Sequence, residues 1–124
     1  MGTDQDGKRK TILIADDDPG IVDALAQFLE EVGYAVRTTV DATSIGAFAD
    51  GLPDLILLDI RMSGRDGSEI CKRLKSAEAT RAIPIIIFSA SRDTERIARE
   101  AGADDFIAKP FDMDQLVEKI ERYV

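Results

Sequence analysis

Acidic residues directly follow two apolar runs of this sequence. Thr11–Ala15 is followed by Asp16 and Asp17, and Leu55–Leu58 is followed by Asp59. Uninterrupted apolar runs of this length are typical of strands buried on both faces of a parallel sheet. The carboxyl ends of such strands meet at the sheet edge where α/β proteins bind ligands. The three carboxylates are therefore candidates for one site, although aspartates also cap turns and helices.

Two further polar residues follow apolar runs later in the chain. Ser89 comes after Ile83–Phe88, and Lys109 comes after Asp105–Ala108. If the strand order is 2-1-3-4-5, the carboxylates face one another, flanked by a hydroxyl and an ammonium group. Two like charges about 4 Å apart repel by roughly 4 kcal/mol at an effective dielectric constant near 20, so a cation is expected. Oxygen ligands alone favour Mg²⁺ or Mn²⁺ over zinc. The alternative interpretation is a set of unrelated surface charges and helix caps.

Strands alternate with helices along the chain, which predicts an α/β fold with a five-stranded parallel sheet and right-handed crossovers. We expect a flexible tail over residues 1–9 and one domain over residues 10–124. The predicted strands cover residues 11–15, 35–39, 55–58, 83–88 and 105–108. The predicted helices cover residues 19–32, 42–50, 68–76, 94–101 and the segment after Asp112.

Composition excludes several classes of function. A net charge of −8 argues against non-specific nucleic-acid binding, which needs a basic surface. No apolar run approaches the roughly 18 residues of a membrane span, and the polar start lacks a secretory signal, so a cytoplasmic location is expected. The absence of histidine removes histidine-based catalysis within this chain. The single cysteine, Cys71, rules out an intrachain disulfide and is expected to be a small buried residue.

From about Lys10 to Val124 the chain resembles the receiver domain of two-component response regulators. Four motifs carry the resemblance, and together they are highly specific. They are the acidic pair within Ile14–Pro19, the run Leu57–Met62, the dipeptide Ser89–Ala90, and the segment Ala101–Phe106 that leads into Lys109–Pro110–Phe111.

The resemblance implies a flavodoxin-like doubly wound fold with five helices, and it implies roles for individual residues. Asp59 is expected to be phosphorylated by a histidine kinase or a small phosphodonor. Asp17, Asp59 and the backbone carbonyl of Arg61 are expected to bind Mg²⁺, with Asp16 assisting through water. Ser89 and Lys109 are expected to contact the phosphoryl group. The peptide bond before the proline that follows Lys109 is expected to be cis.

The resemblance also implies a switch made by Ser89 and Phe106. Movement of the hydroxyl toward the phosphoryl group vacates space for the aromatic ring, which changes the surface of the fourth helix, fifth strand and fifth helix. Two departures from the family pattern affect this region. Ser63 stands where a proline is common, and the segment from Ser89 to Gly102 is two residues shorter than usual.

The leading hypothesis is a single-domain signalling switch rather than an enzyme, with a sensor histidine kinase or a histidine phosphotransfer protein as phosphodonor. Its downstream protein partner is not defined by the sequence. A second hypothesis is a magnesium-dependent phosphohydrolase of the haloacid-dehalogenase type, because Asp16-Asp17-Asp18 contains the D-x-D pattern of those enzymes. A third is a receiver-like adaptor that never uses phosphate.

Three arginines recur at helical spacing, namely Arg92, Arg96 and Arg99. A solvated helix face is the favoured interpretation of this pattern, and a partner-binding stripe is the alternative.

Overall fold

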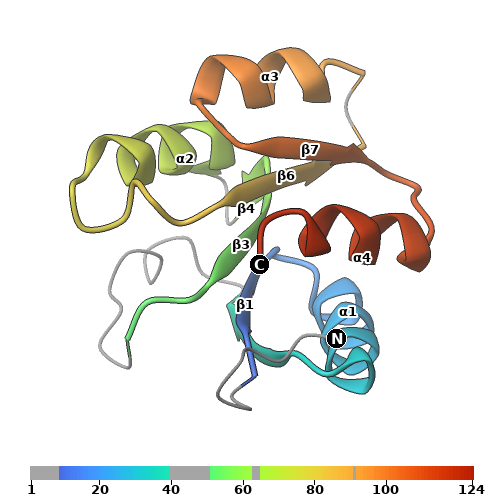
Figure 1. The fold of residues 1–124 in the computed structure, drawn as a ribbon. Coiled ribbons are helices and arrows are strands. Elements are labelled where there is room, and N and C mark those ends of the chain that lie inside the picture. Colours follow the sequence, from blue (N-terminus) through green and yellow to red (C-terminus); the bar gives the residue numbers. More distant parts are fainter. Residues whose placement is uncertain (1–8, 40–50, 63–64, 91) are drawn as a thin grey trace.

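The computed structural model describes residues 9–39, 51–62, 65–90 and 92–124. Its centre is a five-stranded parallel sheet with the order β2-β1-β3-β6-β7 (Figure 1). Counted along the chain, this is the predicted order 2-1-3-4-5. The strands are β1 (Thr11–Ala15), β2 (Ala35–Thr39), β3 (Leu55–Asp59), β6 (Ile85–Ser89) and β7 (Asp105–Ala108).

Burial explains why the central strands are continuous apolar runs. Every residue of β3 and of β6 is buried, because helices cover both faces of the sheet. Edge strand β2 is more polar and is only partly buried. The predicted fourth strand begins two residues too early, because Ile83 and Pro84 precede β6. The Ile83 N–H instead donates to the carbonyl of Thr80 in the preceding turn.

Four helices lie in the part of the chain that the structure describes. Two separate apolar clusters show that α2 and α3 cover one face of the sheet while α1 and α4 cover the other. The fold is therefore doubly wound, as expected. The predicted helix over residues 42–50 falls outside the described residues. The observed helices are α1 (Pro19–Val32), α2 (Gly67–Ser76), α3 (Thr94–Ala101) and α4 (Met113–Glu121).

Local sequence signals account for the helix ends. The Asp18 carboxylate accepts from the N–H of Gly20 at 3.0 Å at the start of α1. The Asp112 carboxylate accepts from the N–H of Gln115 at 2.7 Å at the start of α4. Gly33 and Gly102 end α1 and α3 with positive φ angles of 123° and 82°, a conformation that glycine adopts without strain.

A two-stranded antiparallel hairpin follows the central strand, and the sequence did not predict it. It consists of β4 (Arg61–Met62) and β5 (Arg65–Asp66). Gly67, the first residue of α2, packs so closely on the end of β3 that a Cβ there would overlap the backbone carbonyl oxygen of Asp59. Glycine at this position therefore lets the chain fold back against the end of the strand.

Cys71 lies on the buried face of α2, as predicted. Burial raises the pKa of its thiol to about 11, so the reactive thiolate is scarce at neutral pH.

None of the helices in the described part of the chain has the length and apolar character that a membrane span requires. The Lys109–Pro110 peptide bond is cis, as predicted.

Candidate phosphoacceptor site

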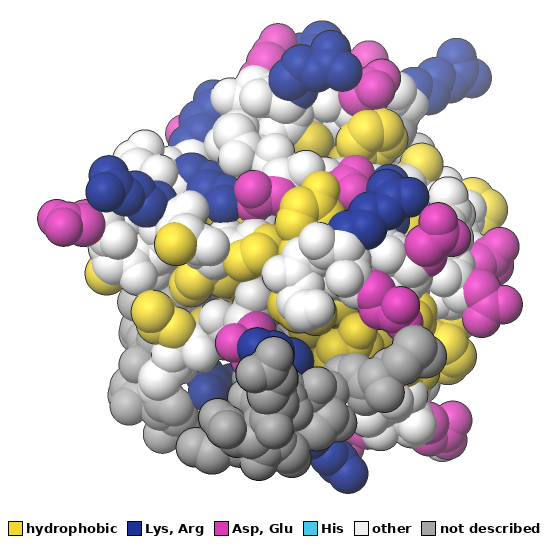
Figure 2. All heavy atoms as spheres, viewed as in Figure 1, with side chains coloured by type: hydrophobic (Ala, Val, Ile, Leu, Met, Phe, Trp, Pro, Cys, Tyr) yellow, Lys and Arg dark blue, Asp and Glu magenta, His cyan; other side chains and the backbone are white. Residues whose placement is uncertain are grey.

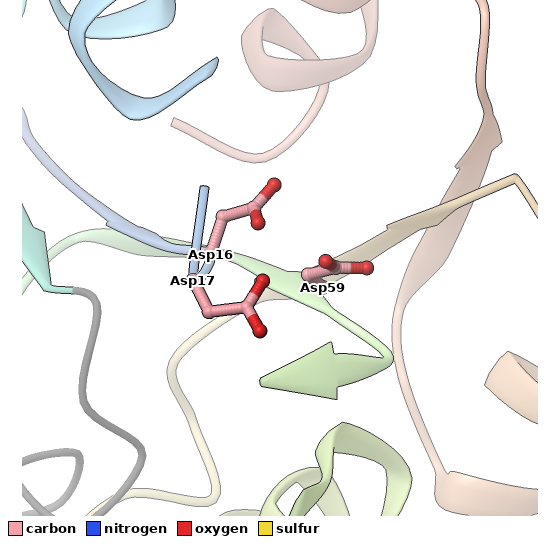
Figure 3. A group of neighbouring side chains, drawn as sticks. All are labelled: Asp16, Asp17 and Asp59. Atoms are coloured by element: carbon pink, nitrogen blue, oxygen red, sulfur yellow. The ribbon is translucent and has the colours of Figure 1, made fainter. Parts of the chain in front are cut away.

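Three carboxylates meet at the carboxyl edge of the sheet. Asp16, Asp17 and Asp59 each offer an oxygen atom, and these atoms all lie within 4.8 Å of one another (Figure 3). The sheet register explains the convergence, because Ala15 of β1 pairs with Leu58 of β3. The residues that follow this pair in the two strands therefore stand side by side. The predicted cluster of carboxylates is present.

The three carboxylates differ in their surroundings. Asp16 is 1% exposed, and one of its oxygens accepts from the backbone N–H of Asp18 at 3.0 Å. Asp59 is 9% exposed, whereas Asp17 lies at the exposed side of the cluster. In Figure 3 the side chains of Asp16 and Asp17 extend from the residues that follow β1, and Asp59 lies beside them at the end of β3. Asp17 is the member of the cluster that is exposed to solvent.

Lys109 brings positive charge into this cluster from the end of β7. Its ammonium nitrogen lies 3.2 Å from an Asp16 oxygen and 3.7 Å from an Asp59 oxygen. One ammonium group cannot neutralise three carboxylates, so the four groups together carry excess negative charge. A hard divalent cation with oxygen ligands fits such a site.

Ser89 occupies the end of β6, between the strands that carry Asp59 and Lys109. It is 7% exposed, and its carbonyl oxygen accepts from the backbone N–H of Lys109 at 2.8 Å. The strand register pairs Asp59 with Phe88, so Ser89 lies one residue beyond the phosphoacceptor candidate on the neighbouring strand. Asp59 thus stands between two carboxylates on one side and the serine–lysine pair on the other.

Arg61 lies in β4, two residues after Asp59. The predicted role of its carbonyl as a metal ligand stays a prediction. Ser63, the departure noted in the sequence, falls outside the described residues.

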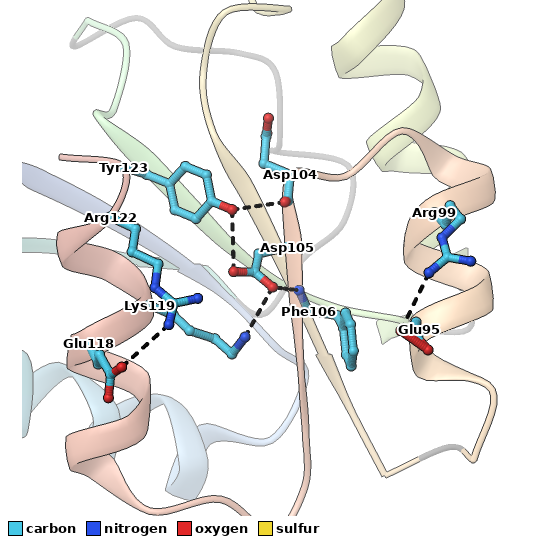
Figure 4. Close-up of polar contacts among 9 residues, drawn as sticks. All are labelled: Glu95, Arg99, Asp104, Asp105, Phe106, Glu118, Lys119, Arg122 and Tyr123. Carbon is cyan, nitrogen blue, oxygen red and sulfur yellow. Dashed lines mark hydrogen bonds and ion pairs between the residues drawn. The ribbon is translucent and has the colours of Figure 1, made fainter.

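Phe106, the predicted switch residue, is half-buried in β7. It packs against the apolar cluster on the α2–α3 side of the sheet, and the ammonium group of Lys119 lies 5.5 Å from its ring centroid. A cavity of about 210 Å³ adjoins the ring. Figure 4 shows Phe106 between α3, which carries Glu95 and Arg99, and α4, which carries Lys119.

An ion-pair network connects β7 to α4 beside Phe106 (Figure 4). The carboxylate of Asp105 accepts from Lys119 at 3.0 Å and from the Tyr123 hydroxyl at 3.2 Å. Burial alone would raise the pKa of Asp105. The hydrogen bonds from the Phe106 N–H, Lys119 and Tyr123, together with the lysine charge, outweigh that effect and lower the pKa.

The arginines of the α3 segment form a solvated face, as the sequence favoured. Arg96 pairs with Asp93 at 3.4 Å and with Glu100 at 3.3 Å, and Arg99 pairs with Glu95 at 3.4 Å. Figure 2 shows basic and acidic side chains interspersed over α3 at the top of the view. Their charges are therefore balanced within the helix.

Sequence reasoning missed two residues that shape the site. The close packing of Gly67 on the end of β3 was not predicted, although a glycine so close to a strand end is a usable signal of close backbone approach. Phe88 was predicted only as part of a buried strand. Its ring lies beneath the ammonium group of Lys109, 4.6 Å from centroid to nitrogen. No local pattern indicates this contact, since it joins residues of two different strands.

The fold and the site together define a class of protein, and comparison with known proteins agrees. The family model of the response regulator receiver domain matches residues 12–121. The chain therefore belongs to the response regulator receiver domain family, whose members are phosphoacceptor signalling domains of two-component systems. The structure bears out the predicted fold class.

Individual relatives agree with this family membership. The chain is 41% identical over 115 residues to the phosphate regulon transcriptional regulatory protein PhoB of Pseudomonas aeruginosa, an alignment that covers 90% of this chain and 50% of that protein. It is 38% identical over 112 residues to the DNA-binding dual master transcriptional regulator RpaA of Synechocystis sp., covering 88% of this chain and 46% of that protein. The chain thus spans about half the length of these curated relatives.

Solved structures are similar over nearly the whole chain. A putative response regulator from Chloroflexus aurantiacus superposes with a TM-score of 0.85 at 33% identity, covering 94% of this chain and 98% of that one. The signal receiver domain of a signal transduction histidine kinase from Syntrophus aciditrophicus gives a TM-score of 0.84 at 33% identity, covering 92% of this chain and 89% of that one.

Proposed function

We propose that this receiver domain accepts a phosphoryl group on Asp59 and that the modification switches its surface for a downstream partner. The cluster formed by Asp16, Asp17, Asp59 and Lys109 at the carboxyl edge carries this proposal. Asp59 is favoured as the acceptor because it lies between the other carboxylates and the end of β6, where Ser89 stands. The proposed domain covers residues 10–124, with a tail before it.

The reaction needs a carboxylate nucleophile and compensation of negative charge. A carboxylate oxygen of Asp59 attacks the phosphorus atom of the donor and forms an acyl phosphate. The bond between phosphorus and the donor's leaving group breaks, and the leaving group departs with the electron pair. Aspartate carboxylates are ordinarily ionised at neutral pH, so no general base is required. The protein thereby assists its own phosphorylation without acting on a separate substrate.

The acidic cluster is proposed to hold Mg²⁺, or Mn²⁺ in its place. Asp17, Asp59 and the backbone carbonyl of Arg61 are the proposed direct ligands, and Asp16 assists through water. The donor set fits because carboxylate oxygens are the preferred ligands of these hard cations. When bound, the ion would supply positive charge that offsets the negative charge of the acceptor carboxylate and of the incoming phosphoryl group.

Ser89 and Lys109 are proposed to bind the phosphoryl oxygens. The serine hydroxyl donates a hydrogen bond, and the lysine ammonium adds a point charge. Movement of Ser89 toward the phosphoryl group is proposed to let the Phe106 ring move inward. The surface of α3, β7 and α4, which corresponds to the predicted fourth helix, fifth strand and fifth helix, then changes shape.

The phosphodonor is proposed to be a sensor histidine kinase, a histidine phosphotransfer protein or a small phosphodonor, acting in the cytoplasm. The sequence contains no histidine, so a phosphohistidine donor must lie outside these 124 residues. The downstream partner is proposed to be a protein. RpaA of Synechocystis is named a DNA-binding regulator, but the part of it that this chain matches is only 46% of its length. The phosphohydrolase alternative is not favoured, because the family match covers nearly the whole chain.

Intact mass tests the proposal directly. Wild type and Asp59→Asn are incubated with Mg²⁺ and acetyl phosphate, with and without EDTA. We expect a gain of one phosphoryl group in wild type only, and loss of that gain with EDTA. A gain that survives Asp59→Asn but not Asp16→Asn would instead support the phosphohydrolase chemistry. No gain in any protein would contradict phosphorylation by small donors and favour a phosphate-independent adaptor.

A further inference from the structure

The ring of Phe88 lies against the ammonium group of Lys109. Phe88 is the penultimate residue of β6 and is 1% exposed. The Lys109 nitrogen lies 4.6 Å from its ring centroid, well within the roughly 6 Å at which an aromatic face attracts a cation. This attraction is stronger where water is excluded, as it is at a buried ring.

Lys109 makes two non-covalent contacts with the end of β6. Its backbone N–H donates to the carbonyl of Ser89 at 2.8 Å, and its ammonium group rests on the ring of the preceding residue, Phe88. The ring is itself fixed by an edge-to-face contact with Phe111, at 6.4 Å between centroids and 89° between planes. Because Phe88 pairs with Asp59 in the strand register, this anchor is beside the phosphoacceptor.

The ring differs from the other partners of Lys109 in one respect. The Asp16 and Asp59 oxygens, 3.2 Å and 3.7 Å away, also belong to the cluster proposed to bind a divalent cation. A bound cation competes for those oxygens and repels the ammonium group. The Phe88 ring is neutral and is no ligand for such a cation, so its attraction for Lys109 persists when the carboxylates are engaged.

We infer that Phe88 is a positioning residue for phosphoryl transfer. Its ring face holds the Lys109 ammonium group beside Asp59 while the carboxylates bind the metal. This inference rests on the proposed function of Asp59 and adds a residue that acts through Lys109. Phe88 touches neither the phosphoryl group nor the metal.

Graded fluorination of Phe88 tests the electrostatic nature of this contact. Mono-, di- and trifluorophenylalanine withdraw electron density from the ring face while hardly changing its volume. We expect the rate of phosphorylation by acetyl phosphate to fall with each added fluorine, to about one fifth for the trifluoro ring. The same substitutions at Phe111 are the matched control and should leave the rate within about twofold of wild type, since the Lys109 ammonium group lies over the ring of Phe88 and Phe111 only packs edge-to-face with that ring.

A spectroscopic measurement requires no phosphoryl transfer. In wild type, the ring current of Phe88 should shift the NMR signals of the Lys109 ε-methylene protons upfield, with and without Mg²⁺. Phe88→Leu should remove the shift, and Lys109→Arg identifies the signals. If wild type is phosphorylated but the phosphorylation rate does not change when Phe88 is fluorinated, the inference is overturned. Loss of the upfield shift on adding Mg²⁺ also overturns it. A wild type that gains no phosphoryl group instead overturns the proposed function, and the positioning role with it.

Discussion

The amino edge and the carboxyl edge of the sheet differ in how their charged groups are paired. At the amino edge, the Lys75 ammonium meets one carboxylate, Asp104 at 2.6 Å, and also donates to the carbonyls of Ile83 at 2.8 Å and Arg81 at 3.2 Å. The Asp104 carboxylate in turn accepts from the Ile85 N–H at 2.8 Å. The charges of Lys75 and Asp104 therefore balance each other, and both groups are hydrogen-bonded to backbone groups at or near the start of β6.

At the carboxyl edge, three carboxylates share the single ammonium group of Lys109. Such an arrangement is costly for the fold, because like charges in a partly buried site repel. Balanced charges at one edge stabilise the structure, and the unbalanced charges at the other are the basis of the proposed binding of a cation and a phosphoryl group. Variants at the two edges should therefore change stability in opposite directions, and only variants at the carboxyl edge should change phosphorylation.

The largest effect is expected from Asp59→Asn at the carboxyl edge. Phosphorylation by acetyl phosphate should fall below detection, because an amide is no substitute for the carboxylate nucleophile. In the absence of divalent ions the free energy of unfolding should rise by about 1 kcal/mol, since one repelling charge is removed. Intact mass and urea denaturation measure the two effects. A variant that loses both phosphorylation and stability would contradict the proposed contrast between the edges.

The next largest effect is expected from Lys75→Met at the amino edge. The change keeps the apolar stem but leaves a carboxylate without its ammonium partner and two carbonyls without this donor. We expect a loss of about 2 kcal/mol in the free energy of unfolding, with an unchanged phosphorylation rate. Lys72→Met, which removes only an exposed pair with Glu69 at 3.4 Å, is the control and should change stability by less than about 0.5 kcal/mol.

Adding and removing Mg²⁺ should act on the carboxyl edge alone. At a free concentration ten times the dissociation constant, the ion should stabilise wild type by about 1.4 kcal/mol, and EDTA should reverse the gain. Lys75→Met should show the same increment from its lower starting stability. Asp17→Asn, which removes a proposed ligand, should lose most of it. Thermal denaturation with a Mg²⁺ titration provides the measurement, and equal increments in wild type and Asp17→Asn would exclude the proposed ligand.

The smallest effect is a pH dependence at Asp105, another carboxylate with satisfied partners. Its pKa is lowered in the folded state, so its contribution to stability is fully present above the unfolded pKa of about 4. That contribution is lost as the pH falls through the lower folded value. The difference in unfolding free energy between wild type and Asp105→Asn should be about 1 kcal/mol at pH 7 and should shrink below about pH 4. A difference that stays constant down to pH 3 would contradict this account.

The sequence alone determined most of the architecture. Apolar runs such as Leu55–Leu58 identify buried strands because every residue must face a helix layer. Capping residues such as Asp18 and Asp112, and glycines such as Gly33, fix helix ends through hydrogen bonds and dihedral angles that depend only on neighbouring residues. The candidate carboxylates also followed from the sequence, since parallel strands bring their carboxyl ends to one edge.

Only the tertiary structure decided which groups touch. The sequence placed Lys109 near the acidic cluster, but its closer approach to Asp16 than to Asp59 depends on the packing of the whole edge. The contact of Phe88 with Lys109 joins two strands through a ring that a sequence pattern describes only as apolar. Gly67 is required because the start of α2 folds back closely on the backbone at the end of β3. Local sequence encodes periodicity and capping, whereas contacts between distant residues depend on how the finished layers pack.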